Sequence, residues 1–114
     1  MGDGLFAKPQ STSKQVEIQF NAATVNTTFF DATVGSDIPA LTGYVLNNAG
    51  SSGTALVSFF NGGTAGVTVN SLSVAAGKYQ SFFVLGADTI AIRTTVVSTI
   101  ATGDLNIVLN NNPL

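Results

Sequence analysis

The sequence predicts an all-β domain, an antiparallel jelly-roll sandwich of about eight strands with an extended N-terminal connector arm. Short runs of β-favouring residues alternate apolar and polar side chains, the period of a strand with one buried face. Turn signals rich in Gly, Asn and Pro separate these runs roughly every 8 to 12 residues, as in a sandwich or barrel. No segment has the apolar stripe of a helix. A simple up-and-down barrel is the alternative fold.

The clearest element is a β-hairpin within residues 54–74. Its first run, 55–60, alternates in the period of a strand. The turn at 61–66 contains three glycines, which tolerate the positive φ angles that a chain reversal needs. A slip near Asn70 would place the apolar residues of the second run in line: Val67, Val69, Leu72 and Val74.

The other strands are expected before and after this hairpin. They fall in six further runs, which in chain order are 14–20, 24–34, 41–46, 79–85, 89–97 and 105–109. The segments expected to break or reverse the chain between runs are 21–23, 35–39, 47–53, 75–78, 86–88 and 103–104. The apolar residues of the alternating runs would fill the layer between two sheets packed face to face.

Composition favours contacts with other proteins. The chain has 114 residues, enough for one small core, so we expect one domain. Only 9% of the residues are charged, with four basic and six acidic side chains. A soluble monomer ordinarily has more charge to keep copies apart, so self-assembly becomes a hypothesis. Four scattered basic residues cannot neutralise a row of phosphates, so we expect no nucleic-acid partner, and we expect no membrane partner.

Few side chains are suited to catalysis. The sequence has neither His nor Cys, which excludes imidazole catalysis, thiolate nucleophiles, thiolate metal ligands and disulfides. Its six carboxylates stand singly, mostly beside glycine or in expected turns, where Asp favours turn geometry. We therefore expect no enzyme, no cofactor and no metal site. A carboxylate pair brought together by folding is the remaining catalytic alternative.

The N-terminal segment differs in kind from the rest. Glycine, proline and a Gln-Ser-Thr-Ser run mark it as an arm, yet it contains Leu5 and Phe6, for which a disordered tail has no physical need. It is either a frayed end lying on its own domain or an anchor for a neighbouring subunit. The expected division is an arm at 1–13, a sandwich at 14–110 and a C-terminal tail at 111–114.

The first residues do not have the basic start and apolar core of a secretory signal. Three explanations are open at this point. The chain stays inside the cell that makes it, it is released by lysis, or a leader has already been removed.

Three stretches of the sequence resemble the Ena fibre family, the appendages of Bacillus endospores. They are GYVLNN at 43–48, ALVSFFNGGTAG at 55–66 and VAAGKYQSFFV at 74–84. The likeness covers roughly residues 14–109, preceded by a short arm. The best-known members have cysteines in the connector and the barrel, whereas this chain has none. The resemblance therefore points to a thin appendage held together without covalent links.

This resemblance implies a structural subunit that polymerises head-to-tail into a helical homopolymer, with the arm of each copy inserted into the next. It implies an extracellular place on the spore surface, on the exosporium or coat, reached without a signal peptide. It leaves open an anchor protein on the spore and a tip protein as further partners. The connector residues at the subunit interface would be Leu5, Phe6, Ala7, Lys8 and Pro9.

General physics is compatible with this route. An unpaired sheet edge or groove is a template for a segment donated by another chain, and a head-to-tail contact need not close. The alternative function is a carbohydrate- or surface-binding jelly-roll module, such as a lectin-like domain or a viral decoration protein. In that case Tyr44, Tyr79 or the Asn-rich turns would contact the ligand, although the lack of Trp weakens this alternative.

Overall fold

The structure is a computed structural model, which describes residues 12–31 and 40–111 of the chain. In these ranges it confirms the all-β prediction, and no helix there is long and apolar enough to cross a membrane. The eight strands are β1 (Thr12–Ala22), β2 (Thr27–Asp31), β3 (Ala40–Asn47), β4 (Ala55–Asn61), β5 (Val67–Val74), β6 (Tyr79–Val84), β7 (Thr89–Thr94) and β8 (Ala101–Asn111).

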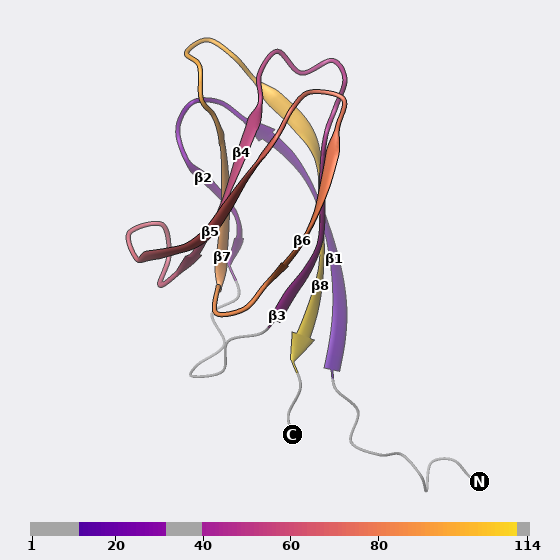
Figure 1. Cartoon of the computed structure of the whole chain (residues 1–114), viewed down its shortest axis with the longest axis vertical. Helices are drawn as coiled ribbons and strands as arrows, with labels where there is room; N and C mark the ends of the chain where they lie inside the picture. Colours follow the sequence, from indigo (N-terminus) through magenta and orange to yellow (C-terminus); the bar gives the residue numbers. More distant parts are fainter. Residues whose placement is uncertain (1–11, 32–39, 112–114) are drawn as a thin grey trace, which may run out of the picture.

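The strands form two antiparallel sheets of four, in the orders β1-β8-β3-β6 and β2-β7-β4-β5 (Figure 1). Strands that follow each other in the chain lie in opposite sheets, except for the hairpin β4–β5. An up-and-down barrel would instead pair consecutive strands all the way round. The topology is therefore that of a jelly roll, and the alternative fold is wrong.

The core lies between the two sheets. The rings of Phe59 from β4 and Phe82 from β6 lie 4.9 Å apart between centroids and join one sheet to the other. Because side chains alternate along each strand, every second residue enters this layer. Its largest members include Phe20, Leu41, Val45, Val57, Phe59, Phe82, Ile90, Ile92, Leu105 and Ile107.

The central hairpin forms as predicted, with φ of 92° at Gly62 in its turn. The expected slip is a bulge one residue earlier than Asn70, because the pairing shifts between Phe59 and Phe60 and leaves Val69 as an extra residue. The first half of β5 nevertheless stays outside the core, and Val67 is 69% exposed. The tip of the hairpin projects from the body of the sandwich (Figure 1).

The expected turn at 103–104 is wrong, because β8 continues through both residues from Ala101 to Asn111. At Gly103 the main chain of β3 lies so close that a Cβ atom would overlap the carbonyl oxygen of Leu46. This glycine therefore marks a close approach of two strands and not a reversal.

Other strand ends also differ from the expectation: β2 begins at Thr27, three residues after the expected start of its run. β1 runs through Asn21 and Ala22, the expected break, because Ala22 is fully buried and pairs with Ala101 of β8. β7 ends at Thr94, three residues before the expected end of its run. The chain then reverses through residues 95–100 before β8 begins.

A buried asparagine ties together the turns at one end of the sandwich. The Nδ2 group of Asn47, at the end of β3, donates hydrogen bonds to the carbonyl oxygens of Gly53 (3.0 Å) and Val74 (2.8 Å). Its main-chain N–H donates to Lys78, and its carbonyl accepts from Gly77. Asn47 thus connects the turn after β3 with the turn between β5 and β6.

Candidate functional site

Within 12–31 and 40–111, no group of three or more potential metal-ligating side chains is present. Asp88, the carboxylate with the clearest environment, has a structural role. Its side chain accepts hydrogen bonds from the hydroxyl of Thr89 (2.8 Å) and from the main-chain N–H of Gly62 (3.1 and 3.2 Å to its two oxygens). The Thr89 bond, followed by main-chain bonds, lowers the pKa of Asp88 below 3.8 although desolvation opposes it. Asp88 therefore joins two turns.

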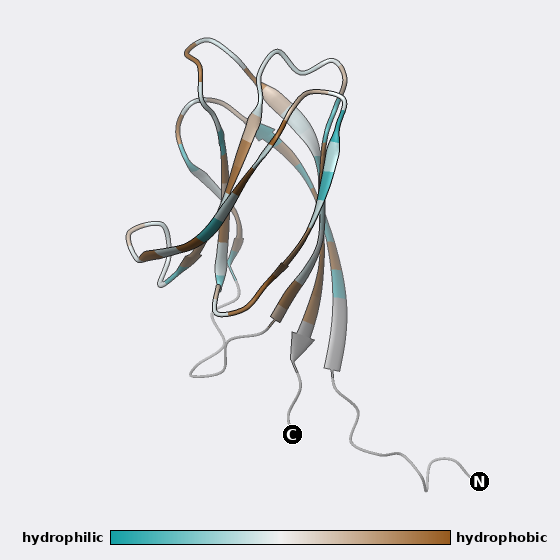
Figure 2. Cartoon of the chain, in the orientation of Figure 1, coloured by the Kyte–Doolittle hydropathy of each residue, from teal (hydrophilic) through white to brown (hydrophobic). Residues whose placement is uncertain are grey.

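Large apolar side chains are exposed on the outside of the sandwich, which is the surface feature that needs a functional explanation. Isolated exposed apolar residues are normal, but contiguous ones mark interaction sites. Figure 2 shows apolar segments along outer strands and in connecting turns. The exposed large apolar residues are Val25, Tyr44, Val67, Val69, Tyr79, Phe83, Leu85, Val96, Val97 and Ile100.

Three of the apolar side chains on strands β3 and β6 enclose a shallow hollow of about 260 Å³, lined by Tyr44, Leu46 and Tyr79. We call it the tyrosine hollow. Leu46 and Tyr79 are paired across the two strands. The rings of Tyr44 and Tyr79 meet edge to face, with centroids 6.4 Å apart and planes at 77°. The tyrosine hollow is apolar and open to solvent.

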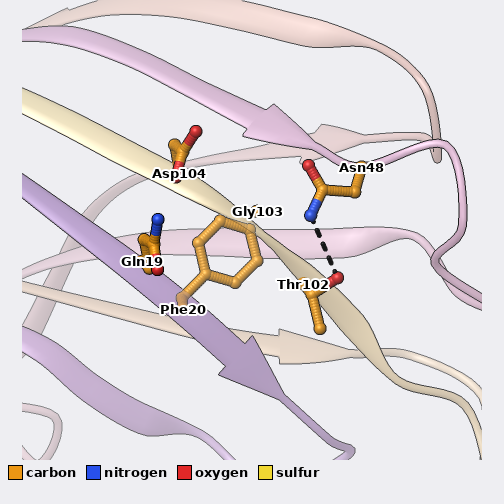
Figure 3. A pocket seen from close by; sticks show the side chains of 6 residues that line it. All are labelled: Gln19, Phe20, Asn48, Thr102, Gly103 and Asp104. Atoms are coloured by element: carbon orange, nitrogen blue, oxygen red, sulfur yellow. Dashed lines mark hydrogen bonds between the residues drawn. The ribbon is translucent and has the colours of Figure 1, made fainter.

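A second hollow, of about 320 Å³, lies at strands β1 and β8 and has a polar lining (Figure 3). We call it the polar hollow. The Nδ2 group of Asn48 donates to the hydroxyl of Thr102 at 3.2 Å. The aromatic residue in the lining of the polar hollow, Phe20, is only 3% exposed and belongs to the core. The lining residues are Gln19, Phe20, Asn48, Thr102, Gly103 and Asp104.

The sheets also have free edges within the described part of the chain. β1 and β6 are the outer strands of one sheet, and β2 and β5 are the outer strands of the other. An edge strand presents main-chain donors and acceptors that a strand from another chain can pair with. The described part of the chain therefore has both exposed apolar side chains and sheet edges suited to protein contacts.

The predicted connector residues, Leu5 to Pro9, lie outside the described residues, so their role stays a prediction. The sequence predicts Tyr44 and Tyr79 as separate ligand contacts and does not predict the hollow that they form with Leu46. The available signal was that Tyr44 and Leu46 share one face of an expected strand. Their pairing with Tyr79 depends on strand register, which the sequence did not reveal.

Comparison with known proteins gives a likeness to a solved structure. No protein-family model matches the sequence, and no curated protein matches it significantly. A solved structure described as belonging to Bacillus endospore appendages, a family of disulfide-linked pili, matches with a TM-score of 0.78 and 26% sequence identity. The match covers 93% of this chain and 93% of the other. The chain is similar to a Bacillus endospore appendage protein.

The resemblance found in the sequence is thus confirmed by the shared fold over nearly the whole length of both chains. The two proteins differ in the crosslinking chemistry that is available to them. The latter belongs to a family of disulfide-linked pili, whereas this sequence contains no cysteine. The chain accordingly fits an endospore appendage type without disulfides.

Proposed function

We propose that this protein is the structural subunit of an extracellular fibre on the spore surface, built from many copies of the same chain. The observation that supports it most is the match to a pilus protein of Bacillus endospores over 93% of both chains. Assembly proceeds head-to-tail, with the N-terminal arm of each subunit inserted into its neighbour. The fibre lies on the exosporium or coat, with an anchor protein and a tip protein as further partners.

Surface chemistry supports self-association. Only 9% of the residues are charged, and the formal net charge is −2, so repulsion between copies is weak. Exposed side chains such as Tyr79 (71%) and Val97 (76%) lose contact with water when subunits meet. When one surface of a copy binds a different surface of the next copy, the contact is head-to-tail and does not close. Its repetition gives a filament.

The arm has the composition of a connector. Leu5 and Phe6, which we call the plugs, would contribute roughly 3 to 6 kcal/mol on burial before entropy costs. Pro9 provides no main-chain donor for a sheet and stiffens the path between the plugs and the sandwich. Main-chain pairing and contacts between sandwiches would supply the remaining association free energy.

A carbohydrate-binding module is the alternative function, and the polar hollow is the observation that favours it. Amide, hydroxyl and carboxylate groups line this hollow (Figure 3), as sugar recognition requires. However, Phe20 is buried and offers no ring face to a sugar. The fibre function therefore has the stronger support.

Substitution of both plugs by serine, Leu5→Ser with Phe6→Ser, tests the role of the arm. We expect the variant to form no filaments, because two apolar groups no longer dock on a neighbour. Its thermal midpoint should equal that of dissociated wild-type subunits. Electron microscopy and thermal unfolding by circular dichroism measure the two properties.

Filaments of unchanged appearance from this variant would contradict the connector role. A loss of several degrees in the midpoint would instead show that the plugs cover their own domain, since 1 kcal/mol shifts a domain of this size by roughly 4 to 8 °C.

A further inference from the structure

We propose that the tyrosine hollow of one subunit receives the plugs, Leu5 and Phe6, of a second copy of this chain. This inference rests on the proposed fibre function and names its acceptor site. The site lies on the outer face of the sheet β1-β8-β3-β6, at strands β3 and β6.

Size and chemistry of the tyrosine hollow suit side chains better than a small molecule. Its volume is about 260 Å³. Sites for drug-sized ligands usually measure roughly 300 to 1,000 Å³ and include several placed polar groups. The lining is apolar, and Tyr79 is 71% exposed, so an apolar segment that covers it removes a large ring from water. One or two apolar side chains are the occupants that fit.

The two hollows on this sheet differ in what they can accept. The polar hollow presents Gln19, Asn48, Thr102 and Asp104, whose hydrogen-bonding groups would lose water without gaining partners beneath an apolar plug. The tyrosine hollow imposes no such cost. The plugs therefore select the tyrosine hollow.

Charges beside the hollow complement those of the arm. Asp3 precedes the plugs by two residues, and Lys8 follows them by two. On the acceptor, Asp104 of β8 pairs directly with Leu46, and Lys78 precedes the first residue of β6. A docked arm can thus place each of its charges near an opposite one, which fixes its direction and opposes the reverse orientation.

The position of the arm favours a neighbour over the same subunit. β1 begins at Thr12, whereas the hollow lies level with Gln19, which pairs with Asp104. Seven residues of strand and three strand spacings separate Thr12 from Tyr79, roughly 27 Å in a straight line. The six residues from Phe6 to Thr12 span at most about 22 Å. Docking on its own hollow would require a sharp reversal at Thr12, and even a fully extended arm would bring the main chain of Phe6 short of Tyr79.

Docking on a neighbour requires no such reversal. The chain enters β1 at the end of the sheet opposite the tyrosine hollow. A second subunit placed beyond that end can present its own hollow to the arm. Donor and acceptor then lie at opposite ends of each copy, and the contact repeats without closing.

The test combines two full-length variants that are each defective in one half of the contact. The first, Leu5→Ser with Phe6→Ser, keeps the hollow but has no plugs. The second, Leu46→Ser with Tyr79→Ser, keeps the plugs but has no hollow. We expect each variant alone to be a folded monomer. Their mixture should form a complex of twice the subunit mass that does not grow further, measured by size-exclusion chromatography with light scattering.

A matched control removes an exposed aromatic residue outside the hollow. Phe83 lies on the same strand, β6, and is 63% exposed. The variant Phe83→Ser should form filaments like the wild type. Loss of filaments in this control would overturn the assignment, because it would show dependence on the whole outer face and not on the hollow.

The remaining outcomes separate the acceptor from the fibre function. If both the wild type and the Leu46→Ser, Tyr79→Ser variant form filaments, the acceptor site is overturned and the fibre function is left intact. An absence of filaments from the wild type itself would overturn the fibre function. No complex in the mixture, together with a lowered thermal midpoint of the hollow variant, would show that the hollow supports its own domain and would also overturn the proposal.

Discussion

Two glycines within strands determine how closely β3 and β8 approach each other. A Cβ at Gly43 would overlap the carbonyl oxygen of Asn106, and one at Gly103 would overlap that of Leu46. Both obstacles are main-chain atoms of a paired strand, which cannot rotate away as a side chain can. The register of the sheet that contains the tyrosine hollow therefore depends on glycine, which has no side chain, at positions 43 and 103.

Replacement of Gly103 by alanine should destabilise the protein by about 3 kcal/mol, because the added methyl group forces the two strands apart. Gly50 is the matched control, since nothing lies within 4 Å of a Cβ at that position. Gly50→Ala should change the free energy of unfolding by less than about 0.5 kcal/mol. Urea unfolding of both variants measures the difference, and equal stabilities would contradict the close approach of β3 and β8.

Gly62 and Gly103 show where a prediction from sequence succeeds and where it fails. Gly62 and its neighbours follow a clear strand, so a turn was predicted and is present. The sequence also predicts a turn at Gly103, since glycine beside aspartate is common in reversals. Only the position of Leu46 on the neighbouring strand distinguishes the two cases, and that position depends on the tertiary pairing.

At the scale of the strands, most consecutive strands lie in opposite sheets. Specific contacts between the connecting turns hold these strands in position. Asp88 provides one of these contacts, between the turn after β6 and the turn after β4. Its carboxylate accepts from Gly62 and Thr89, while its main-chain N–H donates to the carbonyl oxygen of Phe60 (2.8 Å). The hairpin β4–β5 is thereby held against the rest of its sheet.

The variant Asp88→Asn should lower the thermal midpoint at pH 7 by about 3 °C, a small effect because solvent screens this site. The folded state lowers the pKa of Asp88 below 3.8, so its ionised carboxylate stabilises the protein above that pH. The stabilisation by the ionised carboxylate begins to weaken near pH 3.8 and is lost once the pH has fallen through the lowered pKa of Asp88. The difference between wild type and variant should therefore shrink in acid. A difference that grows below pH 3.8 would contradict the role of the ionised carboxylate.

The presence of the strands can be predicted from the sequence, whereas the hollows on the exposed surface cannot. Alternation in the run 55–60 reports a strand with one buried face, and the structure contains it as β4. The tyrosine hollow instead combines residues more than thirty positions apart, Tyr44 and Tyr79, whose contact depends on the pairing of β3 with β6. Periodicity along one strand does not contain that information.

For the whole molecule, the sandwich is a unit with free edges, exposed apolar side chains and little charge. These properties suit a repeating contact between copies. Since the sequence has no cysteine, the fibre that we propose is held together without disulfides, by packing and hydrogen bonds between copies. Its strength then depends on the stability of the folded sandwich.

Reducing agents should therefore leave the filaments unchanged, while denaturant that unfolds the sandwich should dissociate them. Sedimentation before and after each treatment measures the polymerised fraction. Filaments that persist after boiling in denaturant would contradict purely non-covalent assembly unless unfolding is very slow. Mass spectrometry of the boiled sample would distinguish a covalent crosslink from slow unfolding.

The central claim is that subunits polymerise through the N-terminal arm, and electron microscopy of two purified proteins tests it most directly. One is the full chain and the other is residues 12–114, which retain every described strand. We expect filaments from the full chain and only single particles from the shortened one, with circular dichroism verifying that both are folded. Filaments from residues 12–114, or none from the full chain, would contradict the claim.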